Sequence, residues 1–204
     1  MKSRIIITVG RQFGSGGACI ARLLAQQFDC KLYDKEIFAL AAGESGFCEH
    51  FFEQNDERRG FLGALFHPGI PQVGSGCMYD CDFSQDGLFK FQSEAIEKAA
   101  SESDAVFVGR CADYVLRDNP DMVSIFVTAD REDRIATIAR RMNCDREEAE
   151  KLIRSKDGER TSYYEYYTGK RWGRADSYDL CVNSSLLGME ETADWLADFI
   201  RKRS

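Results

Sequence analysis

Four glycines and a serine fall within one eight-residue segment, GRQFGSGG, at residues 10–17. The segment follows the apolar run IIITV and precedes ACIARLLAQQF, whose apolar residues recur at helical spacing. In such a strand–loop–helix turn, backbone N–H groups converge on an anion and the helix N-terminus adds partial positive charge. The pattern therefore predicts a phosphate-binding loop formed by Gly10, Gly14, Ser15, Gly16, Gly17 and Ala18.

Two kinds of ligand-binding loop resemble this segment, and neither matches it fully. The dinucleotide pattern G-x-G-x-x-G requires glycine where Cys19 stands, although Asp34 ends the second predicted strand as a ribose-binding acid would. The mononucleotide pattern G-x4-G-K-[ST] fits with one extra residue, but Gly17 and Ala18 occupy the lysine and hydroxyl positions. A turn that only packs a helix on a strand is the third interpretation. Without the lysine, cations for a phosphate must come from elsewhere, and Arg11 lies in the loop itself.

Short apolar runs alternate with helical patterns along the chain, which is typical of an α/β protein with a parallel sheet. The segment between residues 43 and 90 differs, since it holds eight of the 17 glycines, and we interpret it as an irregular insertion. We expect one domain over residues 1–204, with five strands and helices on both faces. The predicted strands are 4–9, 30–33, 105–109, 123–128 and 178–183, and the predicted helices are 18–28, 35–42, 88–101, 131–142, 146–155 and 190–201.

Composition excludes several classes of protein. The net charge of −7 argues against a nucleic-acid coat or a polybasic membrane surface, and no segment reaches the ~18 apolar residues of a membrane span. The eight cysteines are scattered without a C-x2-C pair, which favours reduced thiols in the cytoplasm. We therefore expect a cytoplasmic protein that binds small molecules, with no nucleic-acid or membrane partner.

The segments GRQFGSGG, YDKEIFALAA, VGRCADYVLRDNP, FVTADREDRIATIARRM, DGERTSYYEYYTGKRWG and YDLCVNSSLLG, in this order, resemble the cytidylate kinase-like family of P-loop proteins. The resemblance implies a nucleoside monophosphate kinase topology: a three-layer fold with a parallel five-stranded sheet, an acceptor region within about 43–90 and a helical lid within about 140–175. It also implies ATP and Mg²⁺. The chain departs from the family where Ala18 and Cys19 replace the usual Arg-Glu pair after the last glycine.

Arginines supply the candidate catalytic cations: Arg11, Arg110 and Arg160. The resemblance assigns Arg110 to the acceptor phosphate; the alternative is a surface arginine that caps a helix. Arg160 matches the arginine-bearing lid. Guanidinium groups suit phosphate oxygens because they bind in bidentate fashion, although each lid arginine is also compatible with a solvated helix face. The candidate lid residues are Arg134, Arg140, Arg141, Arg160, Tyr163, Lys170 and Arg171.

Acidic and aromatic residues complete the predicted site. Asp34, with Lys35, is a helix N-cap or a contact to the acceptor, and Asp113 is a helix cap or a ligand to magnesium-bound water. The tyrosines around Tyr163 pack beneath the lid or stack on a base. Ser15 is the loop's one hydroxyl and hence a weak candidate ligand for Mg²⁺.

The predicted function is ATP-dependent phosphoryl transfer to a nucleoside monophosphate, with CMP or dCMP favoured. Two alternatives stay open at this point. One is a nucleotide sensor that retains the fold without turnover, and the other is a small-molecule kinase with a non-nucleotide acceptor.

Overall fold

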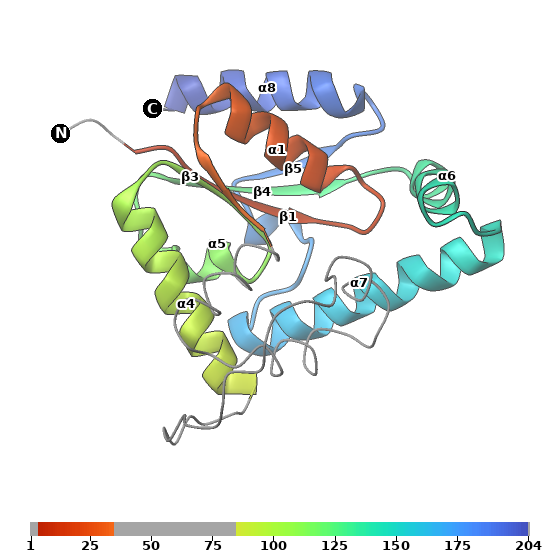
Figure 1. Ribbon diagram of the computed structural model, residues 1–204, viewed down its shortest axis with the longest axis horizontal. Helices are drawn as coiled ribbons and strands as arrows, with labels where there is room; N and C mark the ends of the chain where they lie inside the picture. Colours follow the sequence, from red (N-terminus) through yellow and green to blue (C-terminus); the bar gives the residue numbers. More distant parts are fainter. Residues whose placement is uncertain (1–3, 35–84, 204) are drawn as a thin grey trace, which may run out of the picture. The chain divides into compact units, whose positions relative to one another are not determined.

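The computed structural model describes residues 4–34 and 85–203 (Figure 1). The chain divides into two compact units, Met1–Asp34 with Ile96–Ser204, and Lys35–Ala95. The sheet and the candidate site belong to the first unit. The predicted helix at 35–42, Lys35 and most of the predicted insertion lie outside the described residues.

The sheet consists of five parallel strands, as the sequence predicts, and their order is β2-β3-β1-β4-β5. Its three central strands are nearly continuous apolar runs, because in a parallel sheet covered on both faces each side chain is buried. The strands are β1 (Ile6–Arg11), β2 (Lys31–Tyr33), β3 (Ala105–Val108), β4 (Met122–Thr128) and β5 (Leu180–Asn183).

Helices α1 (Gly17–Gln27) and α8 (Gly188–Arg203) cover one face of the sheet (Figure 1). Each buries a stripe at i, i+3, i+4 and i+7, exemplified by Ile20, Ala21 and Leu24 in α1. These stripes join Val9, Val106 and Ile125 of the sheet in one apolar core. The other helices among the described residues are α4 (Gln85–Glu102), α5 (Ala112–Val115), α6 (Arg131–Met142) and α7 (Arg146–Thr168), with a 3₁₀ turn at Ala175–Ser177.

Strand β1 continues two residues beyond the predicted strand, since Gly10 and Arg11 pair with Phe126 and Val127 of β4. Glycine is needed at position 10, because a Cβ there would lie 2.8 Å from the ring of Phe126. The loop therefore leaves the sheet only after Arg11, whose side chain emerges at the carboxyl end of the strand.

Helix α7 is much longer than the predicted helix at 146–155. It begins at Asp145, whose carboxylate accepts a hydrogen bond from the Glu148 N–H at 2.8 Å, and it ends at Gly169 in the left-handed conformation. Gly158 lies just beyond the end of the predicted helix. The helix instead tolerates that glycine, at a cost of ~1 kcal/mol.

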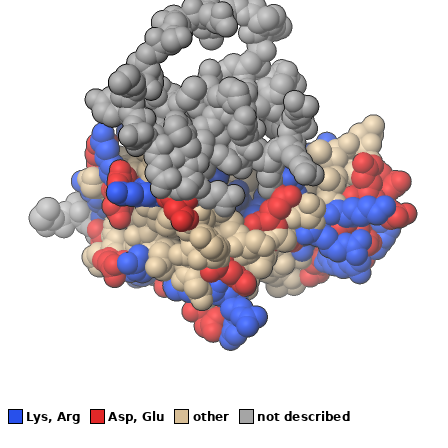
Figure 2. All heavy atoms as spheres, turned by 90° about the horizontal axis from the view of Figure 1, so that it is seen from below, with Lys and Arg blue, Asp and Glu red and all other residues tan. Residues whose placement is uncertain are grey.

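Exposed ion pairs join α6 to α7. Arg146 bonds Glu132 at 2.7 Å and Arg131 bonds Glu150 at 2.9 Å. On the face drawn in Figure 2, basic and acidic side chains are intermingled over the described surface. Among the helices of residues 4–34 and 85–203, none is long and apolar enough to cross a membrane.

Candidate active site

The loop between β1 and α1 presents a row of backbone N–H groups. Gly14 and Gly16 have positive φ angles of 87° and 74°, which bring successive N–H groups to one side. The Ser15 N–H and hydroxyl both bond the Gln12 carbonyl, at 3.3 and 2.9 Å. The N–H groups of Gly14, Gly16, Gly17 and Ala18 make no hydrogen bond to any other described residue. These four donors are therefore available to an anion.

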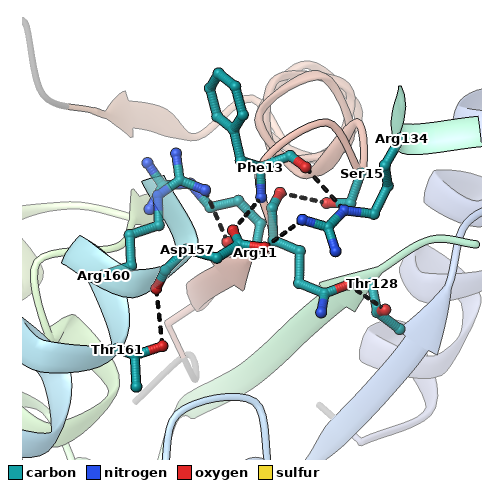
Figure 3. Close-up of polar contacts among 9 residues, drawn as sticks. Arg11, Phe13, Ser15, Thr128, Arg134, Asp157, Arg160 and Thr161 are labelled. Carbon is teal, nitrogen blue, oxygen red and sulfur yellow. Dashed lines mark hydrogen bonds and ion pairs between the residues drawn. The ribbon is translucent and has the colours of Figure 1, made fainter. Parts of the chain in front are cut away.

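Helices α6 and α7 hold the loop at Phe13 (Figure 3). The Phe13 N–H donates to Asp157 Oδ1 at 2.7 Å, and the Phe13 carbonyl accepts from Arg134 Nε at 2.8 Å. Arg134 and Asp157 also form an ion pair with each other, and Arg134 is only 8% exposed. Arg134, predicted for the lid, thus binds the backbone of the phosphate loop.

Arg160 reaches the loop from α7, donating from Nη1 to the Arg11 carbonyl at 3.0 Å. Its guanidinium lies 5.5 Å from the centre of the Phe13 ring, and that of Arg141 lies 4.9 Å from the same ring. Of the other predicted lid cations, Arg140, Lys170 and Arg171 are exposed.

The Arg11 guanidinium lies against Gly109, at the carboxyl end of the neighbouring strand β3; a Cβ on Gly109 would overlap Arg11 Nη1. Burial, followed by the nearby guanidinium groups of Arg160 and Arg110, lowers the pKa of Arg11 to about 9, and Asp34 opposes this shift. Arg11 is thus still protonated at neutral pH. Three cations lie close together here, an arrangement that a bound anion would relieve.

A strained turn places Arg110. Gly109, Arg110 and Cys111 follow one another with φ angles of 74°, 59° and 55°, all in the left-handed region. For the two non-glycine residues this conformation costs ~1–3 kcal/mol each, and such strain clusters at functional sites. The turn begins where the Gly109 N–H bonds the Val9 carbonyl of β1, at 3.1 Å.

These segments enclose a pocket of about 60 Å³. The pocket lies at the carboxyl ends of β1 and β3. The chain leaves these two neighbouring strands in opposite directions along the sheet, and open α/β sheets bind ligands at such a point. All three predicted catalytic arginines line it. The lining residues are Gly10, Arg11, Gly109, Arg110, Cys111, Asp113, Arg160, Tyr163, Tyr164, Trp172 and Tyr178.

Asp113 projects into this pocket and accepts a hydrogen bond from the Tyr164 hydroxyl at 2.7 Å. Burial raises its pKa above the usual 3.8, although the Tyr164 hydrogen bond and the Lys170 charge act in the opposite direction. Cys111 is the N-cap residue of α5, and Asp113 lies in the first turn of that helix, where backbone hydrogen bonds from its own N–H and that of Tyr114 also lower its pKa.

The tyrosines of α7 pack on aromatic neighbours. The rings of Tyr163 and Tyr167 lie 4.8 Å apart, and those of Tyr164 and Tyr178 lie 6.0 Å apart. Burial raises the pKa of Tyr163, and the Arg110 charge lowers it in part. Tyr166 is 71% exposed.

Sequence reasoning missed Asp157, Trp172 and Tyr178. A signal for Asp157 was present, because Asp157, Arg160 and Tyr164 are spaced i, i+3 and i+7, which places them on one face of α7. That face bonds Phe13, Arg11 and Asp113 in turn.

The described residues offer little to a metal ion on their own. Within residues 4–34 and 85–203, no three His, Cys, Asp or Glu side chains form a group that could hold one. Ser15 is 2% exposed, with its proton directed at the Gln12 carbonyl. This donor set suits Mg²⁺ that arrives with a nucleotide and retains its waters, rather than an ion held by protein ligands alone.

Solved structures share the fold. An uncharacterized protein from Eubacterium ventriosum ATCC 27560 is 27% identical with a TM-score of 0.73, covering 97% of this chain and 99% of the other. Shikimate kinase from Acinetobacter baumannii is 9% identical with a TM-score of 0.54 (99% and 96% covered), and APS kinase from Mycobacterium tuberculosis is 14% identical with a TM-score of 0.50 (98% and 98%). The fold is therefore that of P-loop kinases.

No curated protein matches the sequence. The profile of the cytidylate kinase-like family, by contrast, matches residues 6–186, a span that includes the phosphate loop, the Arg110 turn and all of α7. Family and fold together support phosphoryl transfer as the class of chemistry. The chain belongs to the cytidylate kinase-like family.

Proposed function

We propose that this protein transfers the γ-phosphate of ATP to a nucleoside monophosphate, with CMP or dCMP as the favoured acceptor. The observation that carries the proposal is the convergence of Arg11, Arg110 and Arg160 on one pocket, next to a loop with available N–H donors. Two adjacent anion sites are what a reaction between two phosphates requires. The preference for cytidine nucleotides rests on the resemblance of GRCADY and YYTGKRWG to the family's motifs.

In the proposed reaction, an oxygen of the acceptor phosphate forms a bond to the γ-phosphorus while the bond to the β–γ bridging oxygen breaks, and ADP leaves. Such a transfer depends on alignment and on cations around the phosphoryl oxygens more than on covalent help from protein. The loop N–H groups of Gly14, Gly16, Gly17 and Ala18 would hold the donor phosphates. Mg²⁺, when bound with ATP, would supply further positive charge to the phosphates.

Each arginine has a distinct position in this scheme. Arg11 extends from the end of β1, Arg110 from the strained turn after β3, and Arg160 from α7. We assign the acceptor phosphate to Arg110, with Asp34 and Lys35 as further acceptor contacts, and the transferred group to Arg11 and Arg160. The exposed cations Arg140, Arg141, Lys170 and Arg171 stay candidates for the lid.

A phosphate acceptor needs no general base, because its second pKa is near 6 and the attacking oxygen is already ionised at neutral pH. A hydroxyl acceptor, in contrast, must lose a proton as it attacks. Asp113 lines the pocket with a raised pKa, and this observation favours a second candidate function, a kinase for a small hydroxyl-bearing molecule. The solved relatives include proteins in complex with shikimate and with APS plus AMPPNP, so the fold alone does not select the acceptor.

A coupled ADP-release assay with CMP, dCMP, UMP, AMP and GMP tests the proposal. We expect CMP or dCMP to raise ADP release well above the ATP-only background, and Asp113→Asn to retain most of that activity. Loss of activity by more than ~100-fold in Asp113→Asn would favour the hydroxyl acceptor, since general-base catalysis contributes about 10²–10⁴-fold. Tight Mg·ATP binding without transfer to any monophosphate would contradict the enzyme and leave a nucleotide sensor.

A further inference from the structure

The phosphate loop lacks the lysine that contacts β- and γ-phosphates in G-x4-G-K-[ST] loops, and Gly17 stands in its place. The structure shows a steric reason. A Cβ on Gly17 would lie 2.5 Å from Arg11 Cβ, 3.1 Å from Arg11 Cγ and 3.2 Å from Val127 Cβ, so Arg11 makes the closest contact. The first of these atoms is fixed to the backbone of β1, so no rotamer of Arg11 relieves the overlap. A side chain at position 17 and the stem of Arg11 therefore require the same space.

The guanidinium end of the Arg11 side chain requires a second glycine, at position 109. The guanidinium rests on Gly109, where a Cβ would overlap Nη1 and lie 3.2 Å from Cζ. Between these two glycines, the side chain passes from the end of β1 to the end of β3 and enters the pocket beside Arg110 and Arg160. Its charge therefore reaches the phosphates from the strand, whereas a lysine at position 17 would reach them from the first turn of α1.

We propose that Arg11 is the catalytic cation that replaces the missing loop lysine, and that Gly17 is glycine because Arg11 occupies the space of its side chain. The proposal rests on the phosphoryl-transfer function above. Under this proposal the phosphates receive one positive charge, either from Arg11 or from a side chain at position 17, and the two side chains exclude each other. Burial is the largest cause of the lowered pKa of Arg11, and the charges of Arg160 and Arg110 add to it, as expected where several cations surround one site.

A double-mutant cycle tests the shared space. Gly17→Ala adds only the Cβ, and Arg11→Gly removes the stem that it would meet. We expect Gly17→Ala to weaken Mg·ATP binding at least ~5-fold with Arg11 present and to have a much smaller effect in the Arg11→Gly background, where only the Val127 Cβ contact at 3.2 Å is left, measured by calorimetry. Equal effects of Gly17→Ala in both backgrounds would overturn the proposal.

Moving the positive charge from position 11 to position 17 tests the catalytic role of Arg11. Arg11→Gly should lower kcat by about 100-fold or more, the loss seen when one stabilising donor is removed from a transition state. Gly17→Lys alone should also be impaired, because its side chain meets Arg11. The double variant Arg11→Gly with Gly17→Lys should regain at least ~10-fold over Arg11→Gly. A double variant no better than Arg11→Gly refutes the replacement of lysine by arginine.

Arg11→Gln serves as the charge control and covers the case in which glycine in β1 prevents folding. Arg11→Gln retains the stem without the charge, so Gly17→Ala should still weaken Mg·ATP binding in this background. Mg·ATP binding that is unchanged when Gly17→Ala is added to Arg11→Gln contradicts the steric argument. The calorimetric cycle uses Mg·ATP alone and needs no acceptor. If no monophosphate is phosphorylated while the cycle shows coupling, the proposed transfer reaction fails and the shared space of Arg11 and Gly17 stands.

Discussion

The ion pair between Arg134 and Asp157 gives the sharpest prediction, because it combines low exposure with a direct contact to the phosphate loop. We consider Asp157→Asn, which retains Oδ1 as acceptor for the Phe13 N–H and removes the charge opposite Arg134. The two side chains are only 9% and 17% exposed, so Arg134 would be left buried without a counter-charge.

Removal of one partner of a buried pair costs about 3–5 kcal/mol. Arg134 still donates to the Phe13 carbonyl in the variant, and we therefore expect the lower end, ~3 kcal/mol in the free energy of unfolding. For a chain of this length, 1 kcal/mol corresponds to ~2–4 °C, so the melting temperature should fall by roughly 6–12 °C. Mg·ATP binding should also weaken, since Phe13 adjoins the loop donors.

Thermal and urea unfolding measure the effect, with Arg146→Met as the matched control. Arg146 bonds Glu132 at 2.7 Å, yet the two side chains are 59% and 66% exposed, and exposed pairs contribute little. Addition of Arg134→Met to Asp157→Asn removes the stranded charge and should return ~1–2 kcal/mol. The reasoning is refuted if Asp157→Asn destabilises no more than Arg146→Met, or if the second substitution adds to the loss.

Three further outcomes follow from the pocket. Arg110→Ala should weaken acceptor binding by ~1.5–3 kcal/mol, about 10- to 150-fold, with little change in ATP affinity or melting temperature; a large loss of stability with unchanged acceptor affinity would make Arg110 structural. Because burial raises the pKa of Asp113, ionisation of Asp113 opposes folding once the pH exceeds the usual 3.8. Asp113→Asn should therefore raise the melting temperature at pH 7 and not at pH 3. An equal change in melting temperature at both pH values would contradict this. The folded-state pKa of Arg11 is lowered to about 9 from 12.5, so the charge of Arg11 opposes folding below pH 9. Phosphate should therefore stabilise the protein below pH 9, and this stabilisation should decline as the pH rises through 9. The same decline in Arg11→Gln would exclude Arg11 as its cause.

The sheet was predictable from sequence because its strands are local features. Each of β1, β3 and β4 is a short apolar run buried on both faces, and such runs are visible without tertiary information. The strand–loop–helix at GRQFGSGG is equally local. The order of the strands is given by the structure, since the runs themselves carry no pairing information.

The contacts within the site were not predictable, because they join residues far apart in the chain. Phe13 and Asp157 are 144 residues apart, and Arg11 and Arg160 are 149 apart. The helix predicted at 146–155 was too short. In the structure α7 continues to Thr168, and its added turns make contacts of this kind: Asp157 accepts hydrogen bonds from the Phe13 N–H and from Arg134, and Arg160 donates to the Arg11 carbonyl. Local propensity is overridden at functional contacts of this kind.

Helix α7 connects the parts of the site to one another. Asp157, Arg160 and Tyr164 lie on one face and bond the phosphate loop, the end of β1 and α5 respectively. Since a continuous helix fixes the spacing of these three side chains, a shift of α7 along its axis would disturb all three contacts together. The loop donors, the arginine pocket and Asp113 are therefore set by the position of one element.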